Sequence, residues 1–206
     1  ATRGTYIGEA RAIRALCYFD MVRLWENIPL LDIPTTDNIS QANPDDVYQL
    51  IISDLKYAAE NIPANAYPKA QAASNDGHIT KYAAEALLAR VYLFYSGYYG
   101  KEPAGLTRAE ALAGVEDVIA SGEFGLIDEF KNLWPAASVT WTTNNDGSHT
   151  KTNTYAGRGN VETVLAQKFN YTSDYNGNAD GNAWQVMIAL RNLIAVPYGQ
   201  GWGGCT

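Results

Sequence analysis

The sequence predicts a mainly α-helical protein with tetratricopeptide-like helical repeats, followed by an irregular, loop-rich segment that contains a short strand. Helix-like apolar spacing recurs along the first part of the chain, and capping or stop signals flank most of these segments. From Trp134 onward Asn, Gly, Thr, Ser and Tyr dominate instead. We therefore expect a helical scaffold over residues 1–132 and a loop-rich part over residues 133–206.

The first helical segment, residues 8–31, reads GEARAIRALCYFDMVRLWENIPLL. Its apolar residues fall on nearly every side of a helix, which predicts packing from several directions. Pro29 is expected to end the helix, because proline cannot continue the hydrogen-bond ladder. Cys17 fits this helix as a small apolar residue. A disulfide between Cys17 and Cys205 stays open, although nothing in the pattern favours one.

The second helical segment starts at Asn43–Asp46. Asparagine can cap the helix, proline fits its first turn, and the two aspartates favour the positive end of the helix dipole. Apolar residues follow at helical spacing, and only Asp54 interrupts the stripe. Asn61 and Pro63 are expected to end this helix before a loop over residues 64–77.

Two further helices are expected to follow. Thr80 starts the third, which is rich in alanine and ends near Gly100, so that neighbouring helices can approach it closely. Thr107 and Glu110 have the spacing of a capping box at the start of the fourth, and Gly122 marks its end. Four helices joined by loops are typical of a helical-repeat scaffold.

The second half gives fewer signals. Glu162–Phe169 alternates well enough to predict a strand, and Ala183–Val196 is compatible with a short helix. We assign Trp25 and Trp134 to the core or to a seam between domains. The glycine-rich tail, residues 197–204, is not a natural end for a domain, so we expect the chain to be cut within its fold.

Composition and charge exclude several classes of partner. The formal net charge is -7 and there is no basic run, which argues against nucleic acid and against adhesion to anionic lipid. No apolar run of about 18 residues is present that could span a bilayer. Residues 1–6 have no apolar core of the kind that a signal peptide carries.

The patterns for metals and catalysis are also incomplete, so we expect no cofactor, no metal and no enzyme activity. The calcium-like run Asp174–Gly181 lacks the glutamate that should close such a loop. His78 and His149 lie in separate loops without partners at ligand spacing. No pair of carboxylates is selected for glycoside hydrolysis, and helix capping explains Asp45–Asp46.

The first helical segment closely resembles the signature helix of the SusD/RagB family of nutrient-binding outer-membrane lipoproteins. Further segments resemble the family in the right order, so that the resemblance covers roughly residues 8–170. These segments are DDVYQLIISDLKYAAENIP, HITKYAAEALLARVYLF, AEALAGVEDVIASGEFGLIDEFKNLW and NVETVLAQKF. Family members are longer and carry a lipidated N-terminal cysteine, so we expect a fragment whose ligand-binding region, residues 133–206, is truncated.

The resemblance implies a non-catalytic protein at the surface of the bacterial outer membrane. It would bind an oligosaccharide or polysaccharide and deliver it to a TonB-dependent, SusC-like transporter. Helical repeats would form the scaffold and the surface that faces the transporter. Contact with the membrane would be only through a lipid anchor that this chain lacks.

Binding a sugar needs a flat ring for its apolar C–H face and polar groups for its hydroxyls. One ring face hides 80–100 Å², worth at most about 2–2.5 kcal/mol, so two or three rings are needed. In the family, aromatic residues at about positions 170–175 and 201–202 lie near the ligand in some members. We predict a site from aromatic and polar residues of the second half: Tyr171, Tyr175, Trp202, Trp184, Asn170 and Asp174, with Trp141 as a further candidate.

Alternatives remain at this point. Each of these rings could instead pack under its own loop. The chain could be a helical-repeat scaffold for protein–protein interaction, although the polar positions of its helices lie at caps and ends. An enzyme acting on glycosides is the third possibility, and it requires an essential Asp or Glu.

Overall fold

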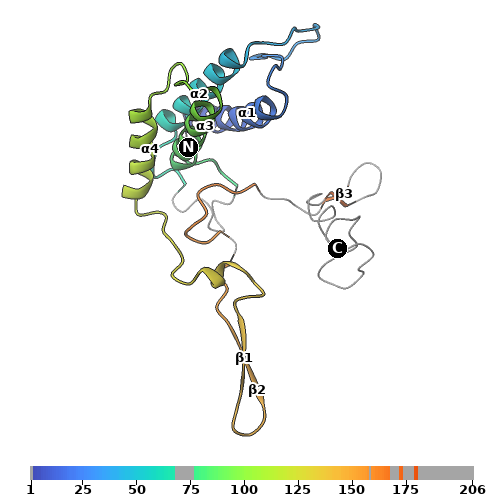
Figure 1. Ribbon diagram of the computed structural model, residues 1–206, viewed down its shortest axis with the longest axis vertical. Coiled ribbons are helices and arrows are strands. Elements are labelled where there is room, and N and C mark those ends of the chain that lie inside the picture. Colours follow the sequence, from blue (N-terminus) through green and yellow to red (C-terminus); the bar gives the residue numbers. More distant parts are fainter. Residues whose placement is uncertain (1, 68–76, 158, 168–171, 174–178, 181–206) are drawn as a thin grey trace. The chain divides into compact units, whose positions relative to one another are not determined.

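The computed structural model describes residues 2–67, 77–157, 159–167, 172–173 and 179–180 (Figure 1). Two compact units, residues 1–166 and 167–206, can be distinguished by their internal contacts, and each is described by itself. The larger unit contains all the described helices and one β-hairpin. The described part of the smaller unit consists of two short paired strands.

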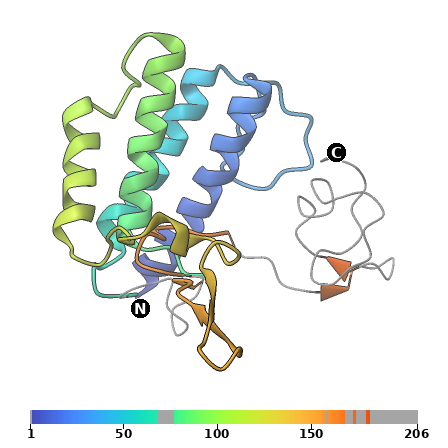
Figure 2. The same cartoon turned by 60° about the horizontal axis from the view of Figure 1, so that its bottom comes forward.

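The larger unit is mainly helical, as predicted. Helix α1 packs on α2, α2 on α3 and α3 on α4, so that consecutive helices lie side by side (Figure 2). The elements are α1 (Arg3–Trp25), α2 (Pro44–Asn61), α3 (Lys81–Tyr99), α4 (Arg108–Ala120), η2 (Phe130–Leu133), β1 (Val139–Thr143) and β2 (His149–Asn153), with β3 (Thr172–Ser173) and β4 (Ala179–Asp180) in the smaller unit.

Three helices begin where the sequence predicts. Asn43 caps α2 and Thr80 caps α3, each with a side-chain oxygen that accepts a hydrogen bond from a backbone amide of the first turn. Thr107 and Glu110 form the reciprocal capping box of α4. These caps satisfy amides that have no partner within the helix, which is why local sequence locates them well.

The predicted end of α1 is wrong. The helix stops at Trp25, before Pro29, because Glu26 adopts a left-handed φ of 58° while its N–H still bonds to the Val22 carbonyl. Pro29 lies outside the helix and forms an isolated β-bridge with Gln41. The helix therefore ends at the backbone turn of Glu26, and not because Pro29 lacks an N–H.

The prediction that α1 is packed on nearly every side is also wrong for the described structure. Ile13 and Leu24 are exposed, and the Trp25 side chain is 65% exposed. Cys17, which we expected among apolar neighbours, is also exposed. Only one side of the helix reaches the shared core, whose buried members on α1 include Ala12, Ala15, Phe19 and Val22.

The core is formed mainly by α1, α2 and α3. A glycine allows α1 to approach α2 closely, since a Cβ atom at Gly8 would lie 2.9 Å from Cγ1 of Ile62. At the other end of α2, the ring of Tyr48 packs edge-on against Phe19 and Tyr95. Small residues at one end and rings at the other set the separation of these helices.

The strand predicted over Glu162–Phe169 is wrong for its described part, residues 162–167, which has no strand. Leu165 instead packs against the helical core, where it shares a small apolar cavity with residues of α1, α2 and α3. Leu165 is thus partly covered by helices and not by a neighbouring strand. The helix considered over Ala183–Val196 lies outside the described residues.

Candidate functional site

The six residues predicted to bind ligand lie outside the described residues. They are Asn170, Tyr171, Asp174, Tyr175, Trp184 and Trp202. In the same stretch of sequence, the structure describes the antiparallel pair of β3 and β4. In this pair Thr172 lies opposite Asp180 and Ser173 opposite Ala179. The glycan site of the second half therefore stays a prediction.

Trp141 is the one sugar-binding candidate that the structure describes. It lies on β1 directly opposite Lys151 of β2, and its side chain is 65% exposed. The Lys151 Nζ atom lies 5.8 Å from the centroid of the indole ring. Alternate residues of a strand share a face, so Thr143, His149 and Asn153 lie on the same face of the hairpin as Trp141, and Thr140, Thr142, Thr150 and Thr152 lie on the other. An exposed ring with polar side chains on the same face matches the two chemical needs of a pyranose.

The other described tryptophans are not core residues. Trp134 and Trp25, which we assigned to the core or a domain seam, are both exposed. Trp134 packs edge-on against Phe130 of η2, with ring centroids 6.3 Å apart, and Phe130 is also exposed. This aromatic pair was not predicted from the sequence. The spacing of four residues between Phe130 and Trp134 was the signal that could have indicated it.

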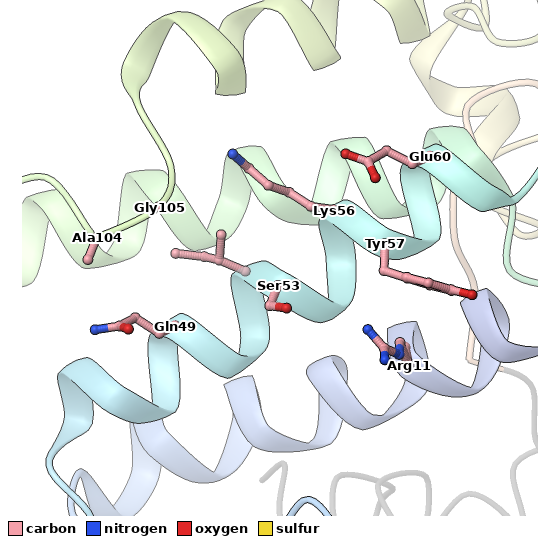
Figure 3. A pocket seen from close by; sticks show the side chains of 9 residues that line it. Arg11, Gln49, Ser53, Lys56, Tyr57, Glu60, Ala104 and Gly105 are labelled. Atoms are coloured by element: carbon pink, nitrogen blue, oxygen red, sulfur yellow. The ribbon is translucent and has the colours of Figure 1, made fainter.

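A pocket of about 470 Å³ runs along the solvent side of α2 (Figure 3). Arg11 of α1 borders it on one side and Ala104–Gly105, from the α3–α4 connection, on the other. The guanidinium of Arg11 lies over the ring of Tyr57, 4.2 Å from its centroid. The residues of α2 that line the pocket are mostly polar, namely Gln49, Ser53, Lys56, Tyr57 and Glu60. Polar residues therefore occur in the middle of α2, and not only at caps and ends as we expected.

Close to this pocket, Asp54 is buried in the α1–α2 contact. Its two carboxylate oxygens accept hydrogen bonds from Nε and Nη2 of Arg14, at 2.7 and 2.8 Å. The side chain of Asp54 is 1% exposed, so a charge that interrupts an apolar stripe is compensated by a bidentate partner. The sequence signal for this ion pair was the presence of two arginines in α1, Arg11 and Arg14, to which no other role had been assigned.

A second carboxylate, Glu9 of α1, holds the connection between α2 and α3. It accepts hydrogen bonds from the Tyr67 hydroxyl at 2.6 Å and from the Ile79 amide at 3.2 Å, and lies 2.8 Å from Nδ1 of His78. The rings of Tyr67 and His78 stack at 4.1 Å. Burial, and then the bond to Glu9, raise the pKa of Tyr67 to about 12. His78 therefore has a carboxylate partner that sequence spacing did not reveal.

Comparison with known proteins gives consistent matches. A model of the SusD-like family, described as starch-binding and associating with the outer membrane, matches residues 3–93, which span α1, α2 and most of α3. A SusD-like protein of Bacteroides ovatus is 32% identical over 146 residues, covering 65% of this chain and 24% of that protein. Together these matches support the assignment of this chain to the SusD-like family.

Solved structures of SusD-like proteins agree in fold. A SusD-like protein of Bacteroides fragilis is 26% identical, with a TM-score of 0.60, over 98% of this chain and 33% of that one. A SusD homologue of Bacteroides thetaiotaomicron is 30% identical, with a TM-score of 0.51, over 64% of this chain and 25% of that one. The chain thus spans about a quarter to a third of the length of these relatives.

Two kinds of feature are absent from the part of the chain that the structure describes. No described helix combines the length and the apolar character needed to cross a membrane. No three His, Cys, Asp or Glu side chains among the described residues are grouped so that they could share a metal ion. The similarity to SusD-like proteins, the exposed rings and the pockets are the features of this chain that point to a function.

Proposed function

We propose that this SusD-like chain is part of a non-catalytic, glycan-binding protein at the surface of the bacterial outer membrane. It would pass oligosaccharide to a TonB-dependent transporter of the SusC-like kind and reach the membrane through a lipid anchor. The observation that carries this proposal is the match of residues 3–93 to a family described as starch-binding and associating with the outer membrane.

The exposed ring of Trp141 supports the proposal within the described residues. A pyranose stacked on it would cover an apolar face, while Thr143 and Asn153, on the same face of the hairpin, would exchange hydrogen bonds with the sugar. The Lys151 ammonium near the ring would form a further hydrogen bond to a sugar oxygen. A single ring contributes only about 2 kcal/mol, so Tyr171, Tyr175, Trp184 and Trp202, with Asn170 and Asp174, stay the proposed remainder of the site.

Calorimetric titration against a panel of soluble polysaccharides tests this function. We expect saturable binding to at least one glycan, and no release of reducing ends during long incubation. Trp141→Ala should weaken binding about ten- to thirtyfold, as expected for one lost ring face. The combined Tyr175→Ala and Trp202→Ala variant should abolish measurable binding.

A matched control is available for the tryptophan variant. Trp25 is 65% exposed, as is Trp141, but lies at the end of α1, so Trp25→Ala should leave glycan affinity unchanged. An equal loss in both variants would indicate a general effect of removing tryptophan. Binding that survives the Tyr175→Ala and Trp202→Ala pair would remove those residues from the site, and steady release of reducing ends would favour an enzyme.

The pocket along α2 favours a second candidate function, a scaffold for protein–protein interaction. Its side chains offer an amide, a hydroxyl, an ammonium and a carboxylate along α2, with a guanidinium from α1, a mixture that can hydrogen-bond to a peptide backbone. Ser53→Arg would fill this pocket without changing the core. Loss of a partner protein with unchanged glycan affinity in this variant would separate the two functions.

A further inference from the structure

Glu85 lies in the contact between α3 and α4 and is not one of the residues proposed to bind glycan. The residue is only 9% exposed. One carboxylate oxygen, Oε1, lies 3.4 Å from Nζ of Lys81 on the next turn of the same helix. The other, Oε2, is buried and has no hydrogen-bond partner among the described residues. An ionised carboxylate in such a place has lost its hydration without full replacement, which is costly.

Helix α4 approaches α3 closely at this position. Gly114 faces Glu85, and a Cβ atom added to the glycine would lie 3.4 Å from the Glu85 Cβ. On the same side of α4, Asp117 forms an ion pair with Lys81, so the ammonium is shared between two carboxylates. One lysine cannot fully compensate both acids, and the more buried of the two is Glu85.

Other charged groups face this contact from α2 and α4. A pocket of about 370 Å³ between α2, α3 and α4 is lined by Glu85, Lys81 and Asp117, and also by Lys56, Glu60 and Glu110. Lys56 is bonded to Glu110 at 2.6 Å and is therefore engaged elsewhere. The six groups amount to four acids and two lysines, so the surroundings of Glu85 are acidic when all are ionised.

We propose that the α3–α4 contact is a proton-sensitive seam, in which protonated Glu85 lets α4 pack tightly on α3 and ionised Glu85 loosens it. Protonation of Glu85 removes the buried charge and ends its repulsion by Asp117. Lys81 is then paired with Asp117 alone. Ionisation restores the cost of burying the carboxylate and its repulsion by Asp117. Both costs are reduced when α4 moves away and water reaches Oε2. Because the chain continues from α4 towards η2 and the β1–β2 hairpin, the looser state would also free the attachment of that segment.

The direction and the pH range follow from the acid itself. Burial, with a further contribution from Asp117, raises the pKa of Glu85 from 4.5 to about 7, although Lys81 opposes the shift. The folded protein therefore keeps a proton that the open state releases between about pH 4.5 and 7. The seam is therefore tightest below this window, loosens as the pH rises from about 4.5 to 7, and changes no further above it.

Hydrogen exchange read by mass spectrometry on the whole chain tests the seam. Protection of α4 amides, corrected for the intrinsic pH dependence of exchange, is compared at pH 5.5 and 8.5, with α2 amides as the internal reference. We expect α4 protection to fall about tenfold or more relative to α2, because each unit of pKa shift corresponds to a factor of ten. An unchanged ratio of α4 to α2 protection would overturn the proposal.

Three variants assign the effect to its groups. Glu85→Gln removes the titrating group, so the α4 to α2 ratio should become flat with pH. Asp117→Asn removes the nearby like charge and leaves Lys81 to Glu85, so the transition should move to lower pH. Glu60→Gln removes an acid that lines the same pocket from α2 and should keep the native profile. A pH profile that survives in Glu85→Gln, or that Glu60→Gln flattens equally, would refute the role of Glu85.

Discussion

The contacts α1–α2 and α3–α4 each bury a carboxylate, yet they satisfy it to different degrees. Asp54 receives two hydrogen bonds from one guanidinium, at 2.7 and 2.8 Å. Glu85 has a lysine at 3.4 Å and one oxygen without a described partner. Guanidinium matches the geometry of a carboxylate with two parallel donors, whereas an ammonium is a point charge that Asp117 also attracts. The choice of cation thus decides whether a buried acid stabilises its contact.

The largest expected effect is at Asp54. Asp54→Ala should lower the free energy of unfolding by about 3 kcal/mol, because it leaves the Arg14 guanidinium without its bidentate partner. Urea denaturation followed by circular dichroism measures this loss. Replacing both members, Arg14→Met with Asp54→Leu, should recover most of it. A single variant as stable as the native chain would mean that the pair contributes nothing.

Glu85→Gln should act in the opposite direction and depend on pH. A raised pKa in the folded state means that native stability falls as the pH rises from about 4.5 to 7, and the variant lacks this fall. At pH 8 the variant should be more stable than the native chain by about 2 kcal/mol, and near pH 4 the two should converge. A constant difference from pH 4 to pH 8 would contradict the prediction.

Two glycines, one in each contact, allow the packing of α1 on α2 to be compared with that of α3 on α4. Gly8→Ala should destabilise by about 1–2 kcal/mol, since its Cβ would lie 2.9 Å from the middle of the buried Ile62 side chain. Gly114→Ala should stabilise by about 0.5–1 kcal/mol, because its Cβ would make an ordinary contact at 3.4 Å while helix propensity improves. Thermal denaturation of both variants checks the opposite signs, and equal signs would show that the two contacts are equally tight.

The smallest expected effect concerns the connection that follows α1. The Tyr18 hydroxyl donates to the Leu31 carbonyl at 3.0 Å and accepts from the Leu31 amide at 2.8 Å. Tyr18→Phe should cost about 1 kcal/mol in urea denaturation, as expected for hydrogen bonds of this kind. Exchange of the Leu31 amide should accelerate, while the α3–α4 seam should be unaffected. Faster exchange in α4 would show that the two contacts are coupled.

Local signals were predictable from sequence and distant pairings were not. The caps at Asn43, Thr80 and Thr107 involve residues two or three positions apart, so the chain specifies them before any tertiary contact forms. Arg14 and Asp54 are forty residues apart, and Glu9 and His78 sixty-nine. No local pattern relates such residues, and only the packing of helices brings them together. The predicted glycan site falls outside the described residues and stays a prediction.

By itself, the sequence determined the helices, most of their ends and the resemblance to the SusD-like family. These follow from periodicity, capping and turn chemistry, which act over a few residues. Tertiary structure alone decided which side of α1 is buried, where that helix stops and which cation each buried acid receives. Those outcomes depend on the distance between neighbouring helices, and that distance is set by side chains far apart in the chain.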